Sequence, residues 1–374
     1  MKYLLVFGTR PEAIKMAPLV NYLKQHPIAD YKVCVTAQHR ELLDQVLRFF
    51  QIIPDYDLDL MLPDQRLNQL SGRMFIEIDT VLEDYKPDLV FVHGDTSTST
   101  ICALAAFYRG IRVAHIEAGL RTFNRFSPFP EEINRQITGR LADLHFAPTQ
   151  QTKEHLVREG VSPETICISG NTVIDALFMA KNKLASREDL EPEILRLKSL
   201  LDQRKRMILV TGHRRENFGQ GFQQICDALA ALAEREEVEI VYPVHLNPNV
   251  LGPVHEKLAK HKNIFLIDPV GYPTFVWLMQ RAYLILTDSG GVQEEAPALG
   301  KPVIVMRDTT ERPEVVEAGA AILTGSSKSN ILNSCNQLLD DPSKYAQMAI
   351  PCMPYGRGNA AEIIFDFVLK LTLK

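Results

Sequence analysis

The chain has 374 residues, of which 46% are hydrophobic and 23% are charged, and these average values exclude wholesale disorder and collagen-like repeats. At roughly 150 residues per domain, this length predicts two domains of ordinary size. Lys and Arg number 41 against 46 Asp and Glu, and no basic block stands out. We therefore expect no nucleic-acid partner.

The sequence shows no sign of a membrane span or of disulfide bonds. Its longest stretch without Asp, Glu, Lys or Arg, Ile240–His255, is interrupted by prolines. The N-terminal apolar run Tyr3–Phe7 is too short for the core of a signal peptide and predicts a first β-strand. No CxxC motif occurs, so we expect neither a thiolate zinc site nor a disulfide framework. A cytoplasmic protein without membrane contact is the expectation.

Short apolar runs rich in Val and Ile alternate with segments of helical period. The first part of the chain has these expected strands: Lys2–Gly8, Tyr31–Thr36, Asp88–His93, Arg112–Glu117, Asp143–Ala147 and Thr165–Ser169. The second part has Met207–Thr211, Glu239–Val244, Asn263–Asp268, Tyr283–Thr287 and Pro302–Met306. Strands that are apolar on both faces and separated by helices predict parallel sheets covered on both sides. The prediction is two doubly wound, Rossmann-like α/β domains of five or six strands each.

The same pattern sets the expected domain boundaries. The first domain spans residues 1–170, the second spans 171–356, and a helical segment, 357–374, ends the chain. From its residues alone, this last helix could pack on either domain. Gly356–Ala361 fits the dinucleotide fingerprint GxGxxA, but no strand precedes it and none follows, so we reject this match.

In open parallel sheets, ligands bind at the carboxyl ends of the strands. After the first strand come Gly8, Thr9, Arg10 and Pro11, with Lys15 one turn into the next helix. Free backbone amides together with Arg10 and Lys15 predict an anion site, with phosphate favoured. The alternative is a surface turn with two solvated cations.

Three acidic positions follow expected strands or begin a helix in the first domain. Asp95 has an alternative role as the N-cap of a helix beginning at Thr96. Glu117 ends an apolar strand and has no such alternative, whereas Glu131 and Glu132 could simply complement a helix dipole. Together these carboxylates predict acid/base chemistry in a cleft. They do not form a metal signature, because no His lies at ligand spacing.

The second domain supplies polar groups at its own strand ends. His213 lies beside two arginines, which suits a hydrogen bond to a phosphate or a leaving group, and His245 is a weaker candidate. Ser289, Gly290 and Gly291 form a turn that lets backbone approach a diphosphate. Glu294 or Glu295 could reach ribose hydroxyls, although an N-capped helix with acidic first-turn residues explains them almost equally well.

Taken together, a series of strings in this sequence resembles one family, the non-hydrolysing UDP-N-acetylglucosamine 2-epimerases. The strings are FGTRPEAIKMAPL (7–19), TAQHRELLDQVL (36–47), HGDTSTST (93–100), HIEAGLRT (115–122), PFPEEINRQITG (128–139), GNTVIDAL (170–177), TGHRREN (211–217), YPVHLNP (242–248), LTDSGGVQEEAP (286–297) and RDTTERPE (307–314). The resemblance implies the GT-B architecture, with the active site in the interdomain cleft and the C-terminal helix packed back on the first domain.

The resemblance also implies the reaction and the residues that perform it. The family interconverts UDP-GlcNAc and UDP-ManNAc without a metal or a redox cofactor, by loss of UDP to give 2-acetamidoglucal and by its return. The implied catalytic residues are Asp95, Glu117, Glu131 and His213. The implied substrate-binding residues are Arg10, Lys15, Phe275, Ser289, Gly290, Gly291, Glu295 and Arg312. Gln38, His39 and Arg40 match a possible allosteric site for a second UDP-GlcNAc, and the family implies a homodimer.

Other functions stay open at this stage. A GT-B glycosyltransferase shares the fold but would leave the acidic trio unexplained. A related epimerase acts on a UDP-diacetamido uronic acid, and the sequence separates it poorly. Hydrolysing epimerases release free ManNAc, and a silent nucleotide-sugar sensor would have no need of the carboxylates. The carboxylate that removes the C2 proton is not identified by spacing.

Overall fold

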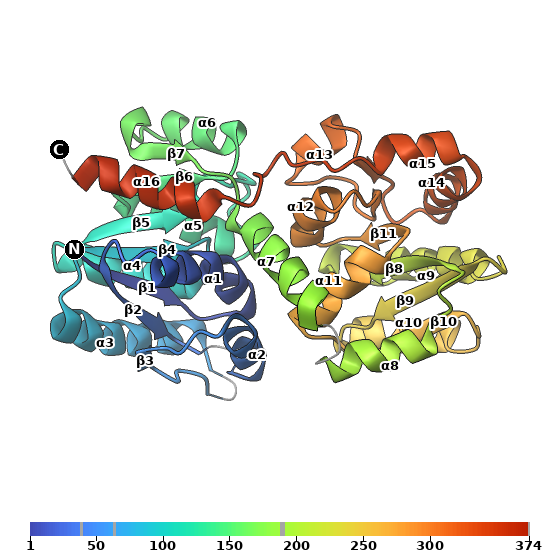
Figure 1. Cartoon of the computed structure of the whole chain (residues 1–374), viewed down its shortest axis with the longest axis horizontal. Coiled ribbons are helices and arrows are strands. Elements are labelled where there is room, and N and C mark those ends of the chain that lie inside the picture. Colours follow the sequence, from blue (N-terminus) through green and yellow to red (C-terminus); the bar gives the residue numbers. More distant parts are fainter. Residues whose placement is uncertain (38–39, 63–64, 188–190, 373–374) are drawn as a thin grey trace. The chain divides into compact units, whose positions relative to one another are not determined.

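The computed structural model describes residues 1–37, 40–62, 65–187 and 191–372, and the chain divides into two units. Unit 1 comprises Met1–Met179 and Tyr355–Lys374, and unit 2 comprises Ala180–Pro354. The boundaries therefore fall after residues 179 and 354, compared with the expected 170 and 356. Figure 1 shows the elements of both units.

Unit 1 is built on a parallel sheet of seven strands in the order β3-β2-β1-β4-β5-β6-β7 (Figure 1). The strands are β1 (Lys2–Phe7), β2 (Asp30–Val35), β3 (Tyr56–Asp57), β4 (Leu89–His93), β5 (Arg112–Ile116), β6 (Leu144–Ala147) and β7 (Ile166–Ile168). Its helices are α1 (Arg10–Gln25), α2 (Arg40–Phe50), α3 (Leu67–Tyr85), α4 (Ser97–Tyr108), α5 (Glu131–Leu141), α6 (Gln150–Arg158), α7 (Thr172–Arg187), which runs into unit 2, and α16 (Ala360–Thr372).

Successive side chains of β1 point to opposite faces of the sheet, and both faces are covered. Leu4 and Val6 join a fully buried cluster with residues of α3 and α4, among them Ile78. Tyr3 points to the opposite face because successive strand side chains alternate, and its ring packs 6.2 Å from that of Phe365 on α16. The sheet is therefore buried on both sides, as the uninterrupted apolar runs predict.

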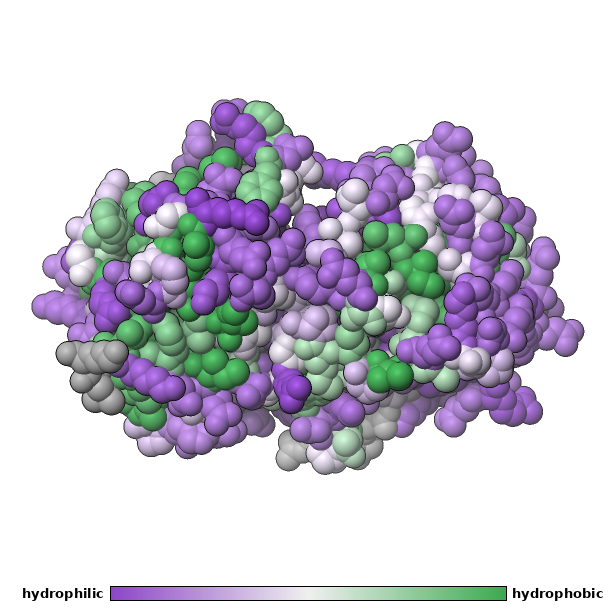
Figure 2. All heavy atoms as spheres, turned by 90° about the horizontal axis from the view of Figure 1, so that it is seen from above, coloured by the Kyte–Doolittle hydropathy of each residue, from purple (hydrophilic) through white to green (hydrophobic). Residues whose placement is uncertain are grey.

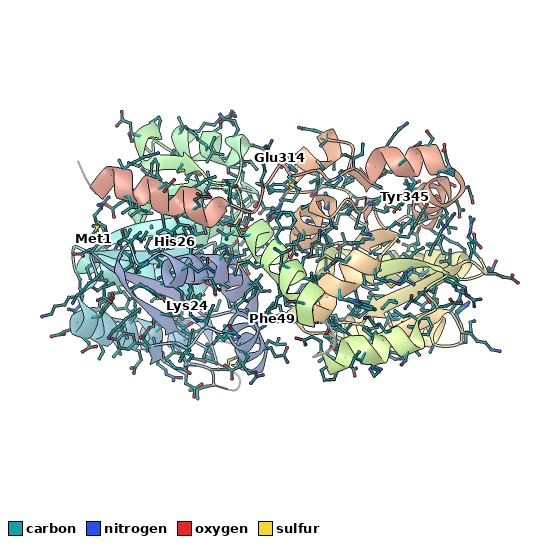
Figure 3. The ribbon with its side chains drawn as sticks, viewed as in Figure 1. Met1, Lys24, His26, Phe49, Glu314 and Tyr345 are labelled. Carbon is teal, nitrogen blue, oxygen red and sulfur yellow. The ribbon has the colours of Figure 1, made fainter. Side chains whose placement is uncertain are left out.

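The C-terminal helix α16 belongs to unit 1. Phe365 stacks on Tyr22 of α1 with ring centroids 5.3 Å apart, and Tyr22 in turn stacks on His26, labelled at the end of α1 in Figure 3. The first turn of α16 is held by Asp175, whose Oδ1 accepts the backbone N–H of Ala361 at 2.9 Å. These contacts fasten the last helix to the first.

Unit 2 has a parallel sheet of six strands in the order β10-β9-β8-β11-β12-β13. The strands are β8 (Arg206–Thr211), β9 (Val238–Pro243), β10 (Ile264–Ile267), β11 (Leu284–Thr287), β12 (Val303–Val305) and β13 (Ala321–Leu323). Its helices are α8 (Pro192–Leu200), α9 (Gln220–Leu232), α10 (Pro248–Leu258), α11 (Tyr272–Arg281), α12 (Gly290–Ala298), α13 (Pro313–Glu317), α14 (Lys328–Asp340) and α15 (Pro342–Met348).

The predicted fold class, two doubly wound parallel-sheet domains, is confirmed, but the predicted strand number is wrong for the first domain. The sequence prediction missed β3 and β13, of two and three residues. Both are edge strands that are not fully buried, so neither produces an apolar run. In each unit the strand order reverses at one point, between β1 and β4 and between β8 and β11. The carboxyl ends at such a switch point are where doubly wound folds bind ligands.

No helix among the described residues is long and apolar enough to cross a membrane. The face of the molecule shown in Figure 2 mixes hydrophilic and hydrophobic residues.

The turn after β5 gives a test of this packing. Gly119 has a φ of +90°, and a Cβ there would lie 2.2 Å from the backbone oxygen of Thr152. Gly160 has a similar φ of +85°, but a Cβ at that position would have no atom within 4 Å. We expect Gly119→Ala to lower the free energy of unfolding by at least about 3 kcal/mol, and Gly160→Ala by about 1 kcal/mol.

Urea unfolding followed by far-UV circular dichroism measures both variants against the wild-type chain. Equal losses in the two variants would contradict the close approach of α6 to this turn.

Candidate active site

The centre of the site in unit 1 is an ion pair between Lys15 of α1 and Glu117, which directly follows β5. Glu117 Oε2 accepts from Lys15 Nζ and also from Asn171 Nδ2 at 2.7 Å. The Lys15 and Glu117 side chains are only 13% and 7% exposed. Lys15 is therefore no solvated surface cation, and the alternative of two solvated cations is wrong for Lys15.

Glu117 has an unusual backbone conformation. Its φ is +61°, in the left-handed region that residues with a side chain rarely adopt. Such a conformation costs about 1–3 kcal/mol and persists only where the surroundings impose it. The neighbouring Ala118 N–H donates to the carbonyl of Phe146 on β6 at 3.0 Å, which holds the turn in place. Strain of this kind clusters at active sites, so the conformation supports a functional carboxylate here.

Next to this pair, His93 at the end of β4 places Nε2 3.8 Å from Glu117 Oε2. The ring is 4% exposed, and burial lowers the pKa of His93 to about 4. The ring is therefore neutral at pH 7, and the positive charge beside Glu117 comes from Lys15. The sequence analysis did not single out His93 or Asn171.

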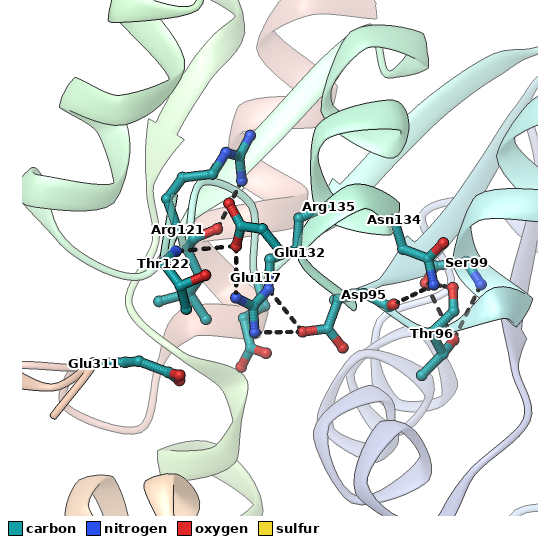
Figure 4. Close-up of polar contacts among 12 residues, drawn as sticks. Asp95, Thr96, Ser99, Glu117, Arg121, Thr122, Glu132, Asn134, Arg135 and Glu311 are labelled. Atoms are coloured by element: carbon teal, nitrogen blue, oxygen red, sulfur yellow. Dashed lines mark hydrogen bonds and ion pairs between the residues drawn. The ribbon is translucent and has the colours of Figure 1, made fainter. Parts of the chain in front are cut away.

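Asp95 is held by Arg135 of α5 (Figure 4). Arg135 donates from Nε at 2.8 Å and from Nη2 at 2.7 Å, both to Asp95 Oδ2. Burial raises the pKa of Asp95, Arg135 and Lys15 act to lower it, and Glu117 acts to raise it, with a net shift upwards. The alternative role of Asp95 as an N-cap is wrong, because Thr96 caps α4 by accepting the N–H of Ser99 at 3.2 Å.

Arg135 is oriented in turn by Glu132, which is fully buried (Figure 4). Glu132 Oε2 accepts from Arg135 Nη1 at 3.2 Å and from the backbone N–H of Thr122 at 3.0 Å. Glu132 Oε1 accepts the N–H of Phe123 at 3.2 Å. Burial acts to raise the pKa of Glu132, but the hydrogen bonds of Thr122 and Gln136 and the charge of Arg135 lower it overall. Glu132 thus holds both the side chain of Arg135 and the loop before α5 in place. It does more than complement the dipole of α5, which was the alternative for this residue.

Glu131, the first residue of α5, has a different environment. Its Oε2 is buried and has no hydrogen-bond partner among the described residues. A buried carboxylate oxygen without a donor is costly in a folded protein. This oxygen is therefore available to accept a hydrogen bond from a bound molecule.

The turn after β1 was expected to have free backbone amides. For two of them, Gly8 and Thr9, this prediction is wrong. Glu12 Oε2 accepts the backbone N–H groups of Gly8 at 3.0 Å and Thr9 at 2.8 Å, forming a capping box at the start of α1. Glu12 Oε1 accepts the hydroxyl of Thr96 at 2.6 Å. Glu12 therefore ties the turn that carries Arg10 to the N-cap beside Asp95. An anion here would have to rely on Arg10 and on later amides of α1.

In unit 2, the switch point of the sheet carries His213 after β8 and Asp288 after β11. His213 is 42% exposed in its side chain, Asp288 is fully buried, and His213 Nδ1 lies 3.4 Å from Asp288 Oδ1. The ring of His245 stacks on that of His213 at 5.4 Å between centroids. The sequence analysis missed Asp288, although its place at a strand end was visible.

The predicted nucleotide-binding residues of unit 2 lie on α11, α12 and the segment before α13. Ser289 is the N-cap residue of α12, and Gly290 and Gly291 are its first residues. Glu295 accepts from Tyr272 OH at 3.0 Å, and the alternative Glu294 is instead buried against the guanidinium of Arg312. Arg312 is therefore partly engaged by Glu294. Phe275 lies half-buried on α11.

The possible allosteric residues lie almost wholly outside the part of the chain that the structure describes. Gln38 and His39 are not described, and of Arg40 only its place at the start of α2 is. Within the described residues, no group of three or more His, Cys, Asp and Glu side chains is arranged to hold a metal ion.

Two doubly wound α/β units with charged side chains at both switch points are typical of enzymes that bind nucleotide-linked substrates at these strand ends. Comparison with known proteins makes this more specific. The family model for UDP-N-acetylglucosamine 2-epimerase matches residues 21–369. A UDP-N-acetylglucosamine 2-epimerase of Yersinia pestis is 55% identical over 365 residues, covering 97% of each chain. The chain belongs to the UDP-N-acetylglucosamine 2-epimerase family, isomerases that act on sugars.

Solved structures agree with this assignment. The structure of a UDP-GlcNAc 2-epimerase of Neisseria meningitidis bound to UDP-GlcNAc is similar with a TM-score of 0.93, at 49% identity, covering 99% of this chain and 100% of that one. A Methanocaldococcus jannaschii UDP-GlcNAc 2-epimerase in complex with UDP-GlcNAc and UDP has a TM-score of 0.83 at 35% identity, covering 99% and 100%.

The contact between Arg135 and Asp95 predicts a shift in pH dependence. Arg135 lowers the pKa of Asp95, so Arg135→Gln raises it further and keeps the carboxyl protonated to higher pH. A limb of the pH–rate profile that requires ionised Asp95 should therefore move to higher pH. The profile of kcat from pH 5 to 9 measures this shift.

Arg140→Gln is the matched control, because Arg140 lies on the same helix and donates to the carbonyl of Glu159 at 2.9 Å. Its profile should follow that of the wild type. A profile that is identical in Arg135→Gln would show that Arg135 does not act through Asp95.

Proposed function

We propose that this chain catalyses the reversible C2 epimerisation of UDP-N-acetylglucosamine to UDP-N-acetylmannosamine by elimination and re-addition of UDP. The observation that carries the proposal is the clustering of two carboxylates, each paired with a cation, at neighbouring strand ends of unit 1: Glu117 with Lys15 and Asp95 with Arg135. Family membership and the UDP-GlcNAc bound to the Neisseria meningitidis relative support the substrate.

The chemistry of the sugar explains why carboxylates are needed. No carbonyl group adjoins C2, so direct loss of the C2 proton would leave an unstabilised carbanion. Breaking the bond between C1 and the UDP oxygen sends its electron pair to the diphosphate, and loss of the C2 proton to a carboxylate then leaves 2-acetamidoglucal. The return of UDP to C1, with protonation of C2 on the other face, gives the epimer. One base and one acid at C2 are therefore required.

The environments of Glu117 and Asp95 differ in the way that a pair of one acid and one base requires. Glu117 lies against the Lys15 cation, whereas burial raises the pKa of Asp95. Carboxyl groups whose environments differ in this way can exchange the roles of acid and base between the two directions of the reaction. Glu131, with its unmet buried oxygen, is the third candidate.

In this proposal the UDP group is bound by unit 2. His213, Arg312 and the Ser289–Gly290–Gly291 turn neutralise the diphosphate, because the first N–H groups of a helix and cationic side chains stabilise phosphate charge. Glu295 binds the ribose and Phe275 lies beside the uracil. Arg10 and Lys15 of unit 1 add positive charge near C1 as the bond to UDP breaks. No metal or redox cofactor takes part.

Incubation of the pure protein with UDP-GlcNAc in D2O tests the reaction. We expect UDP-ManNAc to appear with deuterium at C2, and deuterium to enter the recovered UDP-GlcNAc, because the proton returns from a group that exchanges with solvent. Free ManNAc would indicate a hydrolase, and the absence of both product and exchange would contradict the proposal. The same assay with a UDP-diacetamido uronic acid distinguishes the related epimerase.

Substitution of the carboxylates tests their roles. Asp95→Asn, Glu117→Gln and Glu131→Gln each remove a charge at nearly constant shape, and each should lower kcat about 100- to 10,000-fold without unfolding the protein. Asp79→Asn is the control, since Asp79 forms an exposed ion pair with Arg109. Steady-state kinetics with circular dichroism measures all four variants, and wild-type kcat in Glu117→Gln would remove Glu117 from the mechanism.

A further inference from the structure

The two carboxylate oxygens of Asp288 have different surroundings. Oδ2 accepts from two backbone N–H groups and from Asn217 Nδ2 at 3.4 Å, whereas Oδ1 faces the imidazole of His213. Asp288 directly follows β11 and is fully buried. Its Oδ2 accepts the backbone N–H groups of His213 at 2.9 Å and Arg214 at 2.8 Å. These bonds fix the path of the chain as it leaves β8, so the position of His213 depends on Asp288.

The second oxygen, Oδ1, is the unusual one. It is buried and accepts no hydrogen bond from any described residue. It lies 3.4 Å from Nδ1 of the His213 ring, within ion-pair distance but beyond a well-formed hydrogen bond. An unsatisfied buried carboxylate oxygen is costly, so a small movement of the ring that closes this gap is favourable. Hydrogen bonds of catalytic groups are often long before a ligand binds.

The other groups around the ring oppose its positive charge. His245 stacks on His213 with an interplanar angle of 16°, and its own Nδ1 accepts the N–H of Asn247 at 3.1 Å. Burial is the largest influence and lowers the pKa of His213, Arg214 and His245 also lower it, and Asp288 raises it. Asp288 is thus the group that favours the imidazolium form at this position.

We propose that Asp288 is a positioning residue that accepts Nδ1–H of His213 and so directs the other ring nitrogen, Nε2, to the diphosphate of the UDP-sugar. The inference rests on the proposed function for the identity of the anion. With Nδ1–H committed to a carboxylate, neutral His213 has a bare Nε2, which repels phosphate oxygens. Nε2 can donate to the departing diphosphate only from the imidazolium, which Asp288 stabilises. The pair therefore couples charge on the ring to the presence of the anion.

Replacing Asp288 by Asn should reverse this arrangement. The amide oxygen can keep the two backbone N–H bonds, while the amide NH2 group then faces Nδ1 and forces it to accept. Neutral His213 should change from the Nδ1–H to the Nε2–H tautomer, its titration midpoint should fall, and UDP should bind about tenfold more weakly at pH 7 because a charged hydrogen bond becomes a neutral one.

His245→Gln is the matched control. His245 is exposed, and it lowers the pKa of His213. Its removal should raise the titration midpoint of His213 and leave the Nδ1–H tautomer unchanged. The two variants therefore shift the same signal in opposite directions, which a general loosening of the site would not do.

The measurement is long-range 1H–15N correlation NMR of the full chain labelled with 15N-histidine, titrated with and without UDP, with His213→Gln used to assign the signal. An Nδ1–H tautomer in the wild type that changes to Nε2–H in Asp288→Asn is expected. An Nε2–H tautomer in the wild type overturns the inference, even when Asp288→Asn does not fold. These NMR signals do not depend on turnover. If the wild type shows the Nδ1–H tautomer but the D2O experiment gives neither product nor exchange, only the proposed function is overturned.

Discussion

A largely buried ion pair organises unit 1: Lys15 of α1 contacts Glu117, which directly follows β5. Two charges removed from water are stable only when each has its partner, and loss of one partner from such a pair costs about 3–5 kcal/mol. The pair joins the helix after β1 to β5, which is separated from β1 in the sheet by β4, and Asn171 adds the segment before α7 to the same carboxylate. Glu117 forms these contacts from a left-handed backbone conformation, which is energetically unfavourable for a residue with a side chain.

A second pattern repeats around the strand ends of both units. Three buried carboxylates, Glu12, Glu132 and Asp288, each accept the N–H groups of two consecutive residues. Each of these residue pairs lies on a loop that carries candidate site residues. Because a buried carboxylate with charge-assisted bonds is hard to displace, these loops are held before any ligand arrives. Groups that are preorganised in this way stabilise developing charge without further rearrangement.

The sequence predicted the fold class well because fully buried parallel strands read as uninterrupted apolar runs, as β4 and β8 do. It missed β3 because two edge residues, one half-buried and one exposed, leave no such signal. The C-terminal helix had the right period, but periodicity alone left its partner open, because aromatic stacking on Tyr22 depends on tertiary contacts. The family resemblance implied the first domain, which is where the helix lies.

At the site, the position of a residue at a strand end predicted candidate residues but did not predict which side chains they contact. Lys15 was expected to bind an anion, and the structure pairs it with Glu117, 102 positions away. Glu12 occupies amides expected to be free, because its side chain folds back over the turn. Arg135 and Glu132 were overlooked or undervalued because their contacts reach across to other loops, which spacing along α5 does not reveal.

The central claim is that Lys15 and Glu117 act as one unit, and a double-mutant cycle on kcat/KM for UDP-GlcNAc tests it most directly. Lys15→Met, Glu117→Gln and the double variant are compared with the wild-type chain. The account predicts strong non-additivity, with the double variant no worse than about tenfold below the poorer single variant, since either change already destroys the pair. A double variant whose loss equals the product of the two single losses would show that the two groups act independently and would contradict the account.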